Sequence, residues 1–80
     1  MKMNIIRDAK EIASKVLELK LGSKESMVQA AEVMAAEKYE VGSLMYIIII
    51  KVILAIIEHM LLSGEMPSDD ELTRLTQSND

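Results

Sequence analysis

The chain of 80 residues contains no cysteine, tryptophan or phenylalanine, and it has a single histidine and a single proline. The absence of cysteine excludes disulfide bonds, thiolate nucleophiles and cysteine-based zinc sites. One histidine excludes a multi-histidine metal site within one chain. Tyr39 and Tyr46 are the only aromatic residues, too few for the stacking platforms that bind single-stranded nucleic acids. The length predicts a single domain.

Charge is unevenly distributed along the chain. The formal net charge is −4, which is unfavourable for nucleic-acid phosphates, so we expect no nucleic-acid partner. Residues 1–21 carry five basic and three acidic groups, whereas residues 65–80 carry one basic and five acidic groups. An antiparallel or head-to-tail contact between the two ends would be favoured, although two solvated surfaces are the simpler interpretation. Charges at residues 7–11 interrupt any secretion signal, so we expect a cytoplasmic protein.

Three glycines, each beside a serine, divide the sequence at Gly22, Gly42 and Gly64. Glycine just after a helix and serine at a helix start are the typical boundary residues. They predict helices over about 4–21, 24–40 and 44–62, and a proline-led acidic segment predicts a short helix over 69–77 and a frayed tail at 78–80. We therefore expect an all-α domain over residues 1–77: a small bundle of three main helices plus a short C-terminal helix, completed by self-association.

The flanking helices have distinct apolar patterns. In the first, apolar residues recur at helical spacing along one side, from Ile5 to Leu19. The second is rich in alanine, which permits close approach by a neighbouring helix. In the last, Ser68 and Glu71 form a capping box, and two leucines offer an edge for docking, Leu72 and Leu75.

The third predicted helix is the most apolar part of the chain. Of the 19 residues from 44 to 62, 16 are hydrophobic. A helix that is apolar nearly all round is buried centrally or lies in lipid. A chain this small hides only about 60–65% of its surface on folding, so part of this helix is expected to face a protein partner. The predicted contact residues are Tyr46, Ile47, Ile50, Lys51, Leu54, Ile57, Glu58 and Leu61.

Two kinds of environment are open for this helix. In a symmetric dimer the third helices would pack antiparallel, with Lys51 of one chain facing Glu58 of the other, since residues seven apart share one face. Alternatively, residues 44–62 would insert into a membrane or lie at its surface. A spanning helix needs about 20 mainly apolar residues, and Lys51 near the centre would cost about 2.5–3.5 kcal/mol, which makes insertion marginal.

Other polar groups do not form a recognisable catalytic or metal site. The acidic residues 69–71 are better explained as a helix start than as a cation site. Glu58 and His59 are adjacent on a helix and point about 100° apart, so they do not form an acid–base pair. Three serines lack a nucleophile context and are expected to cap helices: Ser23, Ser43 and Ser63. We expect no enzyme activity, no metal and no cofactor.

The size of the chain, its amphipathic first helix over residues 5–21 and its aliphatic stretch over residues 45–57 resemble a known protein class. In these features, and in lacking a signal sequence, the chain is similar to the small cytoplasmic antiholins, or lysis-inhibition proteins, of T-even-type phages. The resemblance implies lysis inhibition by binding the cytosolic part of a holin in the host cytoplasm. It carries over no functional residue. From the residues themselves we expect a non-catalytic, protein-binding regulator.

Overall fold

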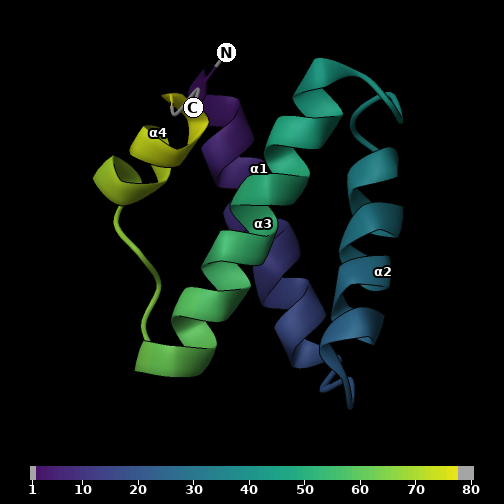
Figure 1. The fold of residues 1–80 in the computed structure, drawn as a ribbon, viewed down its shortest axis with the longest axis vertical. Helices are drawn as coiled ribbons and strands as arrows, with labels where there is room; N and C mark the ends of the chain where they lie inside the picture. Colours follow the sequence, from purple (N-terminus) through teal and green to yellow (C-terminus); the bar gives the residue numbers. More distant parts are fainter. Residues whose placement is uncertain (1, 78–80) are drawn as a thin grey trace.

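The fold is described by a computed structural model that covers the backbone of residues 2–77 and the side chains of residues 5–74. It contains four helices: α1 (Lys2–Glu18), α2 (Lys24–Ala36), α3 (Leu44–Ser63) and α4 (Asp69–Gln77). The described residues form no strand. The expected all-α bundle of three main helices plus a short C-terminal helix is therefore confirmed (Figure 1).

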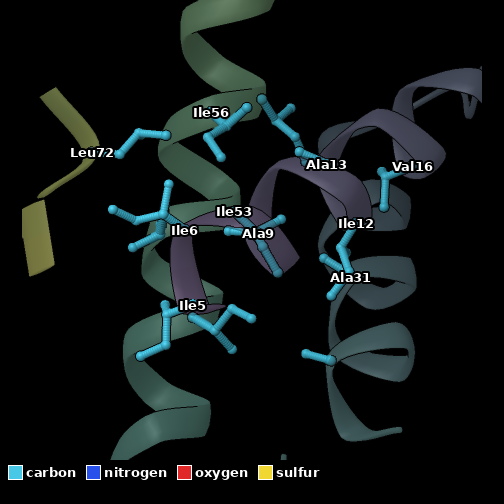
Figure 2. Close-up of a cluster of buried hydrophobic side chains, with 14 residues drawn as sticks. Ile5, Ile6, Ala9, Ile12, Ala13, Val16, Ala31, Ile53, Ile56 and Leu72 are labelled. Carbon is cyan, nitrogen blue, oxygen red and sulfur yellow. The ribbon is translucent and has the colours of Figure 1, made fainter. Parts of the chain in front are cut away.

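The core lies between α1 and α3, with α2 packed on one side of this pair and α4 on the other (Figure 1). The apolar stripe predicted on α1 is almost entirely buried, and the four helices converge on one cluster of side chains (Figure 2). Two buried alanines lie on α1 and two on α2. The buried residues are Ile5, Ile6, Ala9, Ile12, Ala13, Val16, Ala31, Ala35, Ile49, Val52, Ile53, Ile56, Ile57 and Leu72.

A serine caps the start of the apolar helix α3 and a glycine caps its end. The Ser43 hydroxyl accepts a hydrogen bond from the backbone N–H of Tyr46 at 3.1 Å, which caps the first turn. At the other end Gly64 adopts a left-handed conformation (φ +79°) and its N–H donates to the Met60 carbonyl at 2.8 Å. This conformation is unfavourable for residues with a Cβ atom, so glycine is needed here. Ser23 caps α2 in the same way as Ser43 caps α3.

The first two helices end earlier than the sequence predicts. α1 stops at Glu18 because Lys20, and not Gly22, takes the left-handed conformation (φ 52°) and turns the chain. Leu19 consequently leaves the apolar stripe and is 53% exposed. α2 stops at Ala36, and tight turns over residues 37–43 then lead to α3.

Tyr39, in the turn after α2, links that turn to α1. Its hydroxyl donates a hydrogen bond to Asp8 Oδ2 at 2.8 Å. Burial of the phenol, together with the hydrogen bond to the Asp8 carboxylate and its negative charge, raises the pKa of Tyr39 to about 12. This contact between residues 31 apart fixes how the α2–α3 connection lies on α1.

The basic N-terminal and acidic C-terminal segments meet within one chain. Lys10 on α1 forms an ion pair with Asp69 at the start of α4. The predicted capping box is present: the Glu71 N–H donates to the Ser68 hydroxyl, and the Ser68 N–H donates to the Glu71 carboxylate, both at 3.2 Å. Leu72 then inserts into the core. The side chain of Leu75 and the predicted frayed tail lie outside the described residues.

Candidate functional site

The side of α3 that faces away from α1 carries a mainly aliphatic stripe. Its residues up to Glu58 follow one another at intervals of three or four, and the last two lie three and four residues beyond Glu58, which places them all on one face of the helix. Several of their side chains are largely open to solvent; Ile47 is 56% exposed and Leu62 is 89% exposed. We call this surface the outer face of α3; it consists of Leu44, Ile47, Lys51, Leu54, Glu58, Leu61 and Leu62.

The outer face exists because, among the described residues, the neighbours of α3 lie on its opposite side and on its two flanks. The five fully packed residues of α3 all point toward α1 and the flanking helices. α2 and α4 cover the two flanks of α3, and no further element of the described chain crosses in front of it (Figure 1). By length and composition α3 is also the one described helix that could cross a membrane, and 28% of its apolar stretch is buried in the bundle.

The eight predicted contact residues do not all share this surface. Five of them lie on the outer face: Ile47, Lys51, Leu54, Glu58 and Leu61.

The other three lie toward the core or α2. Ile57 is 3% exposed and is part of the core. Tyr46 and Ile50 are half-buried and pack against the core, and the Tyr46 hydroxyl donates to the Glu32 carbonyl at 3.4 Å. Leu44 and Leu62 also belong to the outer face but were not predicted, although the three-to-four spacing from Ile47 and Glu58 reaches both.

Two opposite charges interrupt the aliphatic stripe. Glu58 accepts a hydrogen bond from Lys24 Nζ at 3.0 Å, and both side chains are more than half exposed. An ion pair of this exposure contributes little to stability, about 0–1 kcal/mol. Lys51 is exposed and forms no ion pair with any residue that the structure describes. The outer face therefore offers one unpaired cation and one carboxylate whose pairing is weak.

Glu58 and His59, adjacent in the sequence, face different helices. Glu58 reaches α2 through Lys24, whereas His59 lines a shallow pocket of about 240 Å³ between α3 and α4. The other lining residues are Ala55, Pro67, Glu71 and Leu72. The two side chains are thus not brought together for proton transfer.

The remaining polar candidates have structural partners. The Ser63 hydroxyl donates to the His59 carbonyl at 2.8 Å and accepts from the Glu65 N–H at 3.1 Å, so it closes the end of α3. Asp69 pairs with Lys10, and Glu71 completes the capping box. Within the described part of the chain no three acidic or histidine side chains gather in a way that would hold a metal ion.

Comparison of the chain with models of protein families, with curated proteins and with solved structures finds no match. The similarity to cytoplasmic antiholins therefore stays an expectation from the sequence.

Proposed function

We propose that the protein is a non-catalytic, cytoplasmic regulator that binds a protein chain through the outer face of α3. The observation that carries the proposal is the exposure of large aliphatic side chains along this face, Leu44, Ile47, Leu61 and Leu62 among them. A helix of 20 residues is about 30 Å long, and a stripe about 10 Å wide along it covers about 300 Å². The largest apolar patch on a typical monomer is about 300–600 Å² and is often functional, so the stripe is large enough to serve as a contact surface.

The chemistry of the face suits recognition of a helix or an apolar groove. Leucine and isoleucine at three-to-four spacing are the anchors by which amphipathic helices bind their partners. Lys51 and Glu58 supply opposite charges that favour one orientation of the partner over others. The resemblance to antiholins would make that partner the cytosolic part of a holin.

Site-specific photo-cross-linking tests the proposal in cells that express the full chain. A photoreactive amino acid replaces Ile47 on the outer face, and a matched variant carries it at Gln29, an exposed polar position of α2. We expect one discrete protein adduct from position 47 and none from position 29, because only the first position lies in the contact surface. The absence of a protein adduct at position 47, or equal adducts at both positions, contradicts the proposal.

A membrane-associated role is the second candidate, supported by the length and apolar composition of α3. It requires α3 to leave the bundle or to lie on a bilayer with its outer face in lipid. Withdrawal of α3 would expose the apolar stripe of α1 to water and would bring Lys51 into the bilayer. A lipid adduct in place of a protein adduct at position 47, with flotation of the protein on vesicles, would support this role over the first.

A further inference from the structure

The outer face of α3 is self-complementary about its midpoint. Lys51 precedes and Glu58 follows the point between Leu54 and Ala55 by the same number of residues. Two outer-face aliphatic residues lie before Lys51 and two follow Glu58. A two-fold axis through this midpoint exchanges Lys51 with Glu58 and Ile47 with Leu62.

We infer that a second copy of this chain covers the outer face, with the two α3 helices antiparallel. In this register each Lys51 faces Glu58 of the other copy, and Ile47 of each copy meets Leu62 of the other. Leu54 lies at the axis, beside the small side chain of Ala55, which permits close approach. The inference rests on the proposed function, since it takes the outer face to be a contact surface.

The charges of Lys51 and Glu58 favour the antiparallel pair of α3 helices over a parallel pair. In a parallel pair in register, each Lys51 would face another lysine and each Glu58 another glutamate, and both contacts would be repulsive. The antiparallel pair replaces both repulsions with attractions. It also gives the Lys51 ammonium a partner that the described residues of the monomer do not provide, while Glu58 keeps Lys24 and gains a second cation.

The small size of the surface limits the strength of the dimer. The α3 stripe offers about 300 Å² per subunit by the dimensions of a helix, compared with about 800 Å² per partner in a standard stable interface. We therefore expect a weak dimer, which forms and dissociates with protein concentration.

Charge reversal measured by sedimentation equilibrium tests the register. Because Glu58→Lys would oppose Lys24 within the same chain, all proteins carry Lys24→Gln as a common background. We expect Lys51→Glu to raise the dimer Kd about tenfold, and the double variant with Glu58→Lys to restore it. Lys38→Glu, the same charge change at an exposed site after α2, is the matched control and should have a smaller effect.

Cysteine cross-linking gives a second readout, since the natural chain has no cysteine. Leu54→Cys places one thiol of each copy at the axis, within the range of about 4.4–6.8 Å between Cα atoms that a disulfide spans. We expect oxidation to give covalent dimers faster than in Gln29→Cys. Circular dichroism of each variant checks that helix content is retained.

The outcomes separate this inference from the proposed function. Monomers at all concentrations, no restoration by the double charge variant, or equal cross-linking of Leu54→Cys and Gln29→Cys would overturn the antiparallel dimer. If position 47 then cross-links a different protein, the proposed function stands with another partner. If it cross-links no protein, both fail.

Discussion

A pair of identical substitutions on α3 tests which of its sides is buried. Ile53 is 0% exposed in the core, whereas Ile47, six residues earlier on the same helix, is 56% exposed. Replacing each by alanine removes the same atoms. Any difference in stability therefore reports the surroundings of the two side chains and not their chemistry.

The structure sets different magnitudes for the two changes. Truncation of a fully buried isoleucine to alanine costs about 2–5 kcal/mol, because the apolar contacts are lost and a cavity is left. An 80-residue domain has a free energy of unfolding of about 4–12 kcal/mol, so Ile53→Ala takes a large part of it. At the exposed position the change is within about 0.5 kcal/mol, since alanine also has the higher helix propensity.

The assay is urea unfolding followed by far-ultraviolet circular dichroism, at protein concentrations low enough for the monomer to dominate. Ile53→Val, expected to cost about 0.5–1.5 kcal/mol, provides a measurable variant if Ile53→Ala is largely unfolded. Equal losses at Ile47 and Ile53, or a larger loss at Ile47, would refute the reasoning. Either result would mean that α3 turns a different side toward α1.

Three further predictions concern local structure, each checked by the same unfolding assay. Tyr39→Phe should cost about 1 kcal/mol at neutral pH, because the hydrogen bond to Asp8 is lost at a partly solvated site. The pKa of Tyr39 is raised to about 12 in the fold, so the stability that its hydroxyl contributes is present below pH ~10 and is lost as the pH rises toward 12. If the difference in unfolding free energy between the natural protein and Tyr39→Phe instead grows over this range, the assignment is contradicted. Gly64→Ala should destabilise the fold by about 1 kcal/mol because of the left-handed φ at this position. Gly22→Ala should be neutral or stabilising, because Gly22 has no positive φ and an added Cβ would meet no atom within 4 Å. A change in unfolding free energy of the same sign for both variants would disprove this explanation. Ser43→Ala should cost about 1 kcal/mol through loss of the cap on α3, and an unchanged midpoint would show that the cap is not needed.

Local signals in the sequence were sufficient to predict most of the fold. The stripe of α1, the serine caps of α2 and α3, and the glycine end of α3 follow from spacing and residue type, and the structure shows them as expected. The ends of α1 and α2 were not predictable in this way. Lys20 takes a conformation that glycine prefers, with Gly22 only two residues away, and Tyr39 leaves the helix to bond Asp8 on another element.

The orientation of α3 about its axis was the least predictable feature of the candidate site. Helical periodicity locates a buried face only where polar residues mark the opposite side, and α3 has just three polar residues before its last turn. Ile57 and Leu54 are chemically alike, yet the first is in the core and the second on the outer face. Packing against α1 decides between them. Lys51 and Glu58 were the two markers in the sequence, and both do lie on the exposed side.

Those two charges also limit what the outer face of α3 can bind. A wholly aliphatic stripe would associate with any apolar surface, because hydrophobic attraction is not directional. Insertion into a bilayer would require transfer of Lys51 to the apolar interior at about 2.5–3.5 kcal/mol, and a parallel copy would place like charges together. A partner that offers a carboxylate opposite Lys51 and a cation opposite Glu58 avoids both costs. In the proposed interaction the aliphatic residues would supply the attraction, and the two charges, about 10 Å apart along the helix, would select the partner and its direction.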